Sequence, residues 1–417
     1  MNKAVCARLL ASATTTTFCT ILAASQTAIA NQSAQGSTFS TFADWCVNRQ
    51  QVSADIKHTV EVLLSRLGTQ DCDEANEKLI SIDSLSFGFE DSVESLAPIT
   101  GLSNLENLWV GGDSVVDLSP IATLDNLKTL LLRTDPAADL APLARLSNLL
   151  VLDLGINDFA DLTPLSGLTQ LQMLNVSNNN VTDITPLANL TSLRALNLTN
   201  NQITTIEPLT KLTNLESLHI GHNEVQDLES LTSLTNLVEL DLSQTGLTDI
   251  APLAYLTQLE LLALSDNAIA DVSTLTGLTK LTELELGNGV GGGHRRGSNA
   301  VSDITPLASL RQLRYLGLAD NGITDISALS ALVNLQELDL NYNDVTRVEP
   351  LTEIAALQQL YIECNPVVDP EVLFDAPFAY VSLATNSASI DAESCREDVF
   401  QQSAEVYQNW LDRTQQP

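Results

Sequence analysis

Histidine is the residue type in this 417-residue chain with the clearest capacity for acid–base or metal chemistry, and the chain has four: His58, His219, His222 and His294. Asp241 is the carboxylate that could accompany His219 and His222, because it occupies the position equivalent to His219 in the next copy of a sequence repeat. An imidazole beside a carboxylate can titrate near neutral pH or ligate a metal ion. Two imidazoles and one carboxylate are an incomplete metal site, and no Gly-x-Ser-x-Gly or His-Glu-x-x-His motif is present. We therefore expect a surface hydrogen bond there, with no catalytic residue, no metal and no cofactor.

Carboxylates are more numerous, and one set recurs at the same repeat position before Ile, Leu or Val: Asp161, Asp183, Asp249, Asp271, Asp303 and Asp325. Short acidic side chains at such positions accept hydrogen bonds from the N–H groups of the turn that follows. A calcium loop of the Asp-x-Asp-x-Asp-Gly type is absent. The sequence predicts a structural role for these aspartates.

Four cysteines follow Ala30: Cys46, Cys72, Cys364 and Cys395. Four cysteines allow three pairings. The pairing Cys46–Cys72 with Cys364–Cys395 is favoured because each bond closes a local loop, whereas the other pairings join distant parts of the chain. A four-thiolate zinc site is the alternative, but it lacks the usual Cys-x-x-Cys spacing.

The segment 1–30 has the pattern of a secretory signal. Lys3 and Arg8 precede an apolar stretch over 9–24, and Ala28-Ile29-Ala30 is a cleavage motif. No later stretch approaches the ~20 apolar residues of a membrane span. We expect a secreted, periplasmic or cell-surface protein after cleavage near Ala30, a location in which disulfides persist. The net charge of −33 argues against binding to nucleic acid or anionic lipid.

A repeat dominates the remaining chain. Paired Leu-x-Leu positions recur from 85 to 362 in thirteen copies, mostly at a 22-residue spacing, and one copy carries ten extra residues. The alternation predicts a short strand with one face buried. A recurring Asn sits where the chain turns away from the strand, and a recurring Pro-Leu predicts extended or 3₁₀ segments on the outer side. Each copy can bury its leucines only against the next copy, so the repeats form one solenoid.

Residues 171–190 (LQMLNVSNNNVTDITPLANL) are a clean copy. Their Leu-x-x-Leu-x-Leu-x-x-Asn-x-Ile pattern resembles the leucine-rich repeat, and the 22-residue length with Asp-Ile-x-Pro-Leu resembles the internalin type. The phosphatase-regulator subclass is also similar, but it is intracellular. The resemblance covers about two-thirds of the chain and implies an α/β solenoid with a curved parallel sheet on its concave side and partner binding through variable residues there. Asp113, Asp135 and Thr245 replace the recurring Asn.

The predicted organisation has five parts: a signal peptide at 1–30, a flexible leader at 31–40, a helical N-terminal cap at 41–80, the repeats at 81–365 with an insertion at 287–298, and a C-terminal cap at 366–417. In the first cap we expect a helix from Ser53 to Leu67 that ends at Gly68, and a second over Asp73–Leu79. In the last, the apolar residues between Val399 and Leu411 predict a terminal helix.

Two groups of variable residues are predicted to lie on the concave face. The apolar row is Trp109, Leu131, Val151 and Met173, flanked by Asn107, Arg133 and Asp153. The acidic group is Glu239, Asp241, Glu283, Glu285, Glu337, Asp339 and Glu363, interleaved with Tyr315, Tyr342 and Tyr361. Exposed apolar patches favour binding, and like charges on neighbouring strands repel unless a basic partner relieves them.

We therefore expect an exported, non-catalytic and monomeric module that binds a protein partner on its concave face, with the acidic group favouring a basic partner. The first alternative is glycan or cell-wall binding through Trp109 and the tyrosines. A structural spacer and an enzyme that uses His219, His222 and Asp241 are the others.

Overall fold

The computed structural model describes residues 39–111, 115–133, 139–287, 299–368, 370–373 and 378–382. The predicted signal peptide and its cleavage site, nearly all of the insertion, Asp113, Asp135, Cys395 and the predicted C-terminal helix lie outside these residues.

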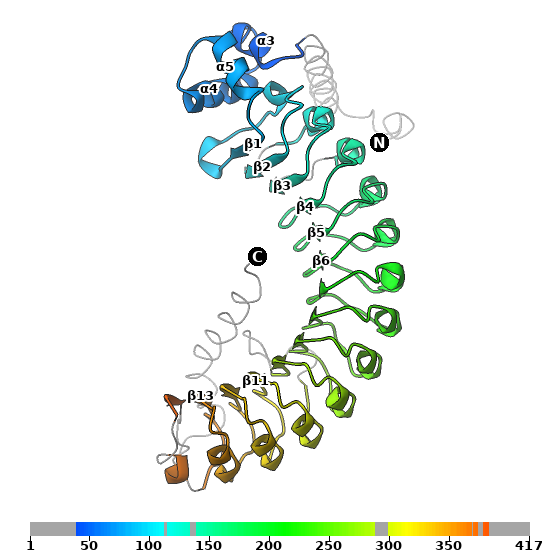
Figure 1. The fold of residues 1–417 in the computed structure, drawn as a ribbon, viewed down its shortest axis with the longest axis vertical. Helices are drawn as coiled ribbons and strands as arrows, with labels where there is room; N and C mark the ends of the chain where they lie inside the picture. The colour runs from blue at the N-terminus through cyan, green and yellow to red at the C-terminus, as the bar shows by residue number, and fades with distance from the viewer. Residues whose placement is uncertain are drawn as a thin grey trace, which may run out of the picture.

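One curved parallel sheet forms the inner surface of an open arc, and its strands follow one another in sequence order (Figure 1). The strands are β1 (Ser84–Phe87), β2 (Asn107–Gly111), β3 (Thr129–Arg133), β4 (Val151–Asp153), β5 (Met173–Asn175), β6 (Ala195–Asn197), β7 (Ser217–His219), β8 (Glu239–Asp241), β9 (Leu261–Ala263), β10 (Glu283–Glu285), β11 (Tyr315–Gly317), β12 (Glu337–Asp339), β13 (Gln359–Tyr361) and β14 (Tyr380–Ser382). The predicted leucine-rich-repeat solenoid is confirmed.

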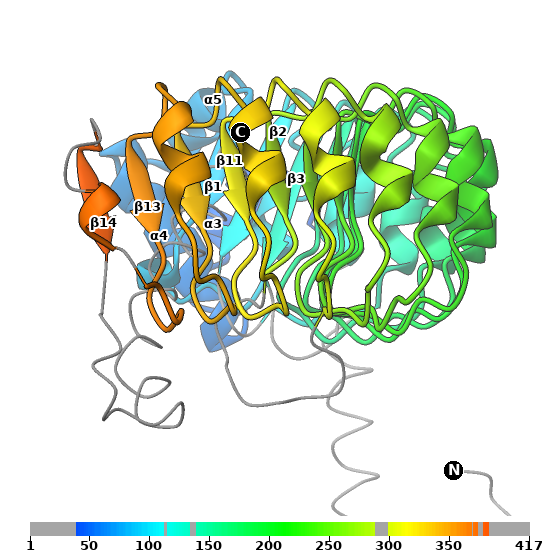
Figure 2. The ribbon, with the colours of Figure 1, turned by 90° about the horizontal axis from the view of Figure 1, so that it is seen from below.

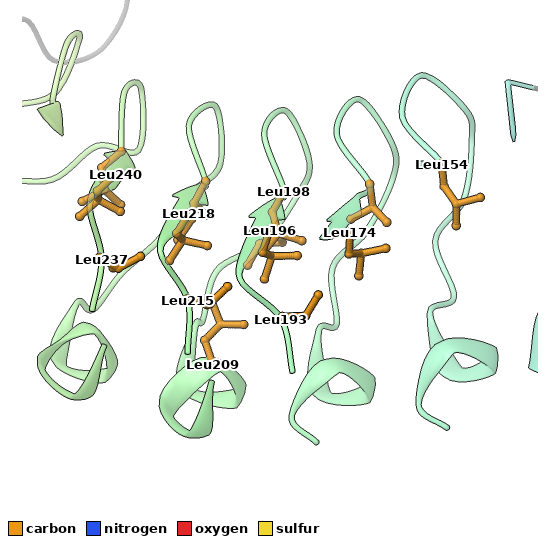
Figure 3. Close-up of a cluster of buried hydrophobic side chains, with 14 of the residues drawn as sticks. Leu154, Leu174, Leu193, Leu196, Leu198, Leu209, Leu215, Leu218, Leu237 and Leu240 are labelled. Carbon is orange, nitrogen blue, oxygen red and sulfur yellow. The ribbon is translucent and has the colours of Figure 1, made fainter. Parts of the chain in front are cut away.

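The core is a continuous stack of leucines. The central Leu of each strand pairs with that of the next, as Leu174 does with Leu196 and Leu196 with Leu218. These side chains are buried, and the labelled leucines of successive repeats lie in a row (Figure 3). Burial of a leucine side chain contributes about 1.5–3 kcal/mol, and here that contribution exists only when the neighbouring repeat is in place.

The outer surface is built from 3₁₀ segments, as predicted, and Figure 2 shows them side by side. They are η1 (Phe89–Asp91), η2 (Ala97–Ile99), η3 (Ser119–Thr123), η4 (Ala141–Arg145), η5 (Thr163–Leu165), η6 (Thr185–Leu187), η7 (Glu207–Lys211), η8 (Glu229–Ser233), η9 (Ala251–Tyr255), η10 (Ser273–Gly277), η11 (Thr305–Ser309), η12 (Ser327–Ala331), η13 (Glu349–Glu353) and η14 (Pro370–Leu373).

The recurring aspartates begin these segments. The carboxylate of each one accepts a hydrogen bond of 2.8 or 2.9 Å from the backbone N–H two residues further on. These aspartates are Asp161, Asp183, Asp249, Asp271, Asp303 and Asp325. The predicted structural role is confirmed. At Asp161, side-chain and backbone hydrogen bonds from Thr163 lower the pKa of the carboxyl group, because they stabilise its ionised form.

The recurring asparagines join one repeat to the next, and we call them the ladder. The Asn267 amide donates to the carbonyls of Leu264 in its own repeat (2.9 Å) and Leu242 in the preceding one (2.9 Å). Its Oδ1 accepts from the backbone N–H groups of Thr245 (3.1 Å) and Leu247 (3.0 Å). Backbone groups that would otherwise be buried without partners are thus satisfied.

Two parts of this network were not foreseen. Asn299, directly after the insertion, donates to Leu264 and Leu286 at 2.9 Å each and so takes the ladder position of its repeat. A second series of asparagines lies before β2, β3, β4, β7, β8 and β12 and donates to a carbonyl of the preceding repeat: Asn104, Asn126, Asn148, Asn214, Asn236 and Asn334. At Thr245, which replaces a ladder Asn, the hydroxyl donates to the Leu242 carbonyl at 2.7 Å.

Among the described residues, those directly before nine ladder positions adopt the left-handed conformation, with φ between 53° and 57°: Ile156, Asn178, Asn200, His222, Gln244, Asp266, Asp320, Tyr342 and Cys364. Asparagine tolerates this conformation, whereas a β-branched side chain clashes with its own backbone there. Ile156 is therefore strained, and its side chain is 60% exposed.

Three helices cover the first repeat: α3 (Phe42–Val47), α4 (Ala54–Leu67) and α5 (Cys72–Leu79). As predicted, α4 follows Ser53 and ends at Gly68, whose φ of 66° is the left-handed cap that glycine favours. Helix α3, which was not predicted, begins with a capping box at Thr41 and Asp44. The predicted disulfide Cys46–Cys72 is present and links α3 to α5.

At the other end the sheet continues past the last Leu-x-Leu pair, because β14 pairs with β13. Cys364 is disulfide-bonded as well, and Cys395, its expected partner, lies outside the described residues. No helix among the described residues is long and apolar enough to cross a membrane.

The ladder makes a prediction about stability. Replacing Asn267 by Ala should lower the free energy of unfolding by about 2–4 kcal/mol, because several buried backbone groups lose their partner at once. Asn334→Ala is the matched control, since Asn334 is exposed and its amide donates to the Arg311 carbonyl at 2.8 Å; this change should cost about 0.5–1 kcal/mol. Chemical denaturation followed by circular dichroism measures both, and equal losses would contradict the greater weight of the ladder.

The strain at Ile156 makes a second prediction. Ile156→Asn should raise the free energy of unfolding by about 1 kcal/mol, because asparagine relieves the left-handed clash while little apolar burial is lost. The reverse change at the equivalent exposed position, Asn178→Ile, should lower it by a similar amount. Chemical denaturation again provides the measurement, and a loss of stability in Ile156→Asn would show that side-chain contacts outweigh the backbone strain.

Candidate partner-binding surface

The inner face presents two columns of side chains, one on each side of the buried central leucines. Successive strands in a parallel sheet lie about 4.8 Å apart, so residues in one column are close neighbours. Trp109 pairs with Leu131, while Val151 pairs with Met173. The apolar row therefore divides into two pairs in adjacent columns.

The apolar row is accessible to solvent. The side chain of Trp109 is 38% exposed and that of Met173 is 46% exposed, while Leu131 and Val151 are half-buried. Most other large apolar side chains in the repeats are buried in the core. Four accessible apolar residues on consecutive strands are a surface of the kind that partners cover.

A groove of about 240 Å³ lies at the first pair. It crosses β1, β2 and β3 and is lined by Ser84, Leu85, Ser86, Asn107, Leu108, Trp109, Thr129 and Leu131. Trp109, Leu131 and Asn107 were predicted from the sequence, whereas the serines and the threonine have no distinctive spacing and were not.

Two charged residues flank this region on β3 and β4. Arg133 lies 3.6 Å from Asp153, both half-buried. Asp153 also accepts hydrogen bonds from its own turn, at the Gly155 N–H (2.8 Å), and from the Asn175 amide (3.0 Å). This carboxylate is held in place by three neighbours and so contributes a fixed charge beside the apolar row.

The histidines do not assemble with Asp241. His219 lies 3.1 Å from the Ser217 hydroxyl and 3.9 Å from the Glu239 carboxylate, both measured from Nε2. Asp241 instead accepts from the Ser243 N–H at 2.9 Å, and His222 is exposed in the left-handed position. The neighbouring His219 imidazole lowers the pKa of Glu239. Among the described residues, no three His, Cys, Asp or Glu side chains are grouped to hold a metal ion.

The acidic group differs from the sequence analysis in its exposure. Glu239 and Glu283 are half-buried, but the other five carboxylates are buried, and Asp339 is only 5% exposed. The sequence pattern had suggested a solvated row of charges. Tyr315 is buried too, while Tyr342 and Tyr361 are half-buried, the latter with its ring 5.6 Å from that of Tyr380.

Burial changes the charge of this group. It raises the pKa of Asp339 to about 8, and the neighbouring carboxylates Glu285, Glu337 and Glu363 act in the same direction. The hydrogen bond that Asp339 accepts from the Asn341 N–H, at 2.9 Å, opposes the shift. Burial also raises the pKa of Glu285 and of Glu363. At pH 7 Asp339 is therefore mostly protonated, and part of the formal charge at this end is neutralised.

Glu285 shows how the concave face holds a buried carboxyl group. Its carboxylate accepts from the Tyr315 hydroxyl at 2.6 Å and from the Gly287 N–H at 2.7 Å. The side chain occupies the space beside Gly317 on the next strand, where a Cβ atom would overlap it. Burial raises the pKa of this carboxyl group, and the hydrogen bonds from Tyr315 and Gly287 oppose that effect. Gly317 was not recognisable from the sequence, because its importance comes from its neighbour Glu285.

With the geometry described, comparison with known proteins places the chain. A family model described as leucine-rich repeats (2 copies) matches residues 147–189, 169–211 and 213–255. This defines a leucine-rich-repeat protein, a fold typical of protein–protein interaction modules.

The solved structures narrow the class. Internalin InlF from Listeria monocytogenes is 31% identical, and the match covers 80% of this chain and 95% of that one at a TM-score of 0.71. The chain therefore belongs to the internalin-like leucine-rich-repeat proteins. InlJ from the same species (20% identity, 86% and 79% coverage, TM-score 0.61) and a Leptospira interrogans leucine-rich-repeat protein (21%, 74% and 91%, 0.60) share the fold. No curated protein sequence matches the chain.

The buried carboxylates make stability depend on pH. Because the folded-state pKa of Asp339 is raised, the folded protein keeps a proton that the unfolded chain loses between about pH 4 and pH 8. The free energy of unfolding should therefore fall as the pH rises through this window, with Glu285 and Glu363 adding to the same trend. Each such group contributes a slope of at most about 1.4 kcal/mol per pH unit.

Asp339→Asn should flatten this slope while retaining the bond to the Asn341 N–H. Asp153→Asn, at the same position on β4 but beside Arg133, should leave it unchanged. Chemical denaturation at several pH values between about 5 and 8 measures the slope. A wild-type protein that gains stability across this range would contradict the assigned protonation.

Proposed function

We propose that this protein is exported and acts without catalysis, by binding a protein partner on the concave face of its repeats. The observation that carries the proposal is the apolar row, in which Trp109, Leu131, Val151 and Met173 remain accessible on four consecutive strands. Aromatic and large aliphatic side chains at the centre of a contact supply most of its binding energy.

Two further features support it. The Cys46–Cys72 disulfide fits a protein that resides in an oxidising compartment outside the cytoplasm. Asp241, the carboxylate considered beside the histidines, accepts a hydrogen bond from the backbone of its own turn instead of pairing with an imidazole.

The half-buried members of the acidic group would provide charge selection. Glu239 and Glu283 lie on β8 and β10 and are accessible to a partner. With a net charge of −33 on the whole protein, a basic partner would be attracted at long range. The buried carboxylates Glu285, Glu337 and Asp339, with Tyr315 and Tyr361, would border the contact.

The test is affinity capture from extracellular and envelope fractions with residues 31–417, followed by measurement of the dissociation constant of the purified partner. Trp109→Ala/Leu131→Ala should weaken binding by about tenfold to a hundredfold, as expected for a hot spot. Glu239→Lys/Glu283→Lys should slow association with a basic partner, mainly at low salt.

Tyr255→Ala/Val333→Ala is the matched control. Both residues are apolar and exposed, but they lie on or next to the outer 3₁₀ segments η9 and η12. This variant should bind like the wild type. If it loses the partner while the Trp109/Leu131 variant keeps it, the partner binds the outer surface and the proposal is wrong.

A further inference from the structure

The groove across β1–β3 is lined by polar side chains as well as by the apolar residues Trp109 and Leu131. We propose that it is a subsite for one uncharged sugar ring of a glycan, which packs on the indole of Trp109 and forms hydrogen bonds with the polar side chains around it. This inference does not depend on the protein partner proposed above.

The indole of Trp109 is held against the sheet. Gly111 has no Cβ atom, and the indole packs into the space that this leaves. A Cβ atom at this position would lie 3.0 Å from the Cζ2 atom and 3.2 Å from the Cε2 atom of the indole. The ring is nevertheless 38% exposed and lines the groove. An aromatic surface fixed in this way loses little conformational entropy when a ligand packs on it, and its π-system attracts the partly positive C–H groups of a sugar ring.

The polar lining consists of neutral hydroxyl and amide groups. The Asn107 amide donates to the Ser84 hydroxyl at 3.1 Å, and this hydroxyl donates to the Asp83 carboxylate at 2.9 Å. The Asn107 side chain is thereby oriented at the groove. Ser86 and Thr129 add two hydroxyls to the lining. Hydroxyl and amide groups can both donate and accept, and so can the hydroxyls of a sugar.

The groove lacks the charged side chains that are common elsewhere in this protein. Its eight lining residues include no Asp, Glu, Lys, Arg or His, although the protein contains 52 acidic residues. Carboxylates near the groove already have partners: Asp83 accepts a hydrogen bond from the Ser84 hydroxyl, and Asp153 lies 3.6 Å from Arg133. An anionic glycan would be repelled by the net charge of −33. The lining therefore matches a neutral ligand.

The size of the groove sets the size of the ligand. Its volume of about 240 Å³ lies below the roughly 300–1,000 Å³ of pockets that enclose drug-sized molecules. One ring of a longer chain would occupy it, and the neighbouring rings would extend over the open concave face towards Leu131 and Val151.

The test is a glycan array that holds neutral and sialylated or sulfated oligosaccharides, probed with residues 31–417 and followed by titration calorimetry with the best neutral oligosaccharide. The expected result is binding that is confined to neutral glycans. Trp109→Ala should weaken it by about tenfold or more, and Trp109→Phe should retain most of it. Asn107→Ala should weaken it by roughly threefold to tenfold.

Tyr255→Ala is the control, because Tyr255 is an exposed aromatic residue on the outer segment η9 and does not line the groove; the affinity of this variant should equal that of the wild type. Gly111→Ala provides a further check, since it keeps Trp109 but displaces its ring, and it should weaken binding as well. The proposal is overturned if no neutral glycan binds, if anionic glycans bind better, or if Trp109→Ala and Tyr255→Ala bind alike. Binding of an unglycosylated peptide alone at the groove would also overturn it, and would leave the protein-partner proposal standing.

Discussion

Every coil of this protein buries its leucines only against the coils on either side, and this dependence governs the rest of the structure. A single coil has too little apolar surface to offset the entropy of ordering its chain. The ladder asparagines convert the stacking into a fixed geometry, because each one bonds backbone groups of two coils at once, as Asn267 does. The helices of the N-terminal cap and the Cys46–Cys72 disulfide protect the first coil, which has only one neighbour.

Because the coils stack regularly, the side chains on the concave face form regular columns. The residue types in these columns change from one end of the sheet to the other, while the backbone geometry stays the same. At the first strands the concave face carries the exposed indole of Trp109 and an uncharged groove. At β10–β12 it carries carboxylates whose burial favours the protonated form, with Asp339 as the clearest case. A partner that contacts both ends would meet an apolar, neutral region and a region whose charge depends on pH.

Much of the fold was predictable because the repeat is periodic and its special positions are local. The strands, the 3₁₀ segments, the aspartates that begin them and the ladder asparagines all follow from residue type and spacing, and Gly68 marked the end of α4. The short helix α3, the strand β14 and the ladder position of Asn299 were missed. Helix α3 and β14 are too short to show a period, and the insertion moves Asn299 away from the 22-residue register.

The sequence alone was sufficient for the solenoid and for the side of the sheet on which each variable residue lies, since these depend on periods along the chain, and it favoured the Cys46–Cys72 pairing because of the short separation of the two cysteines. The tertiary structure alone decided which variable residues are accessible. The apolar row stayed exposed, whereas most of the acidic group became buried and Asp241 bonded its own turn instead of a histidine. The physical reason is that exposure and pKa depend on every atom within a few ångströms, such as the space that Gly317 leaves for Glu285 and that Gly111 leaves for Trp109, and no period along the chain records those neighbours.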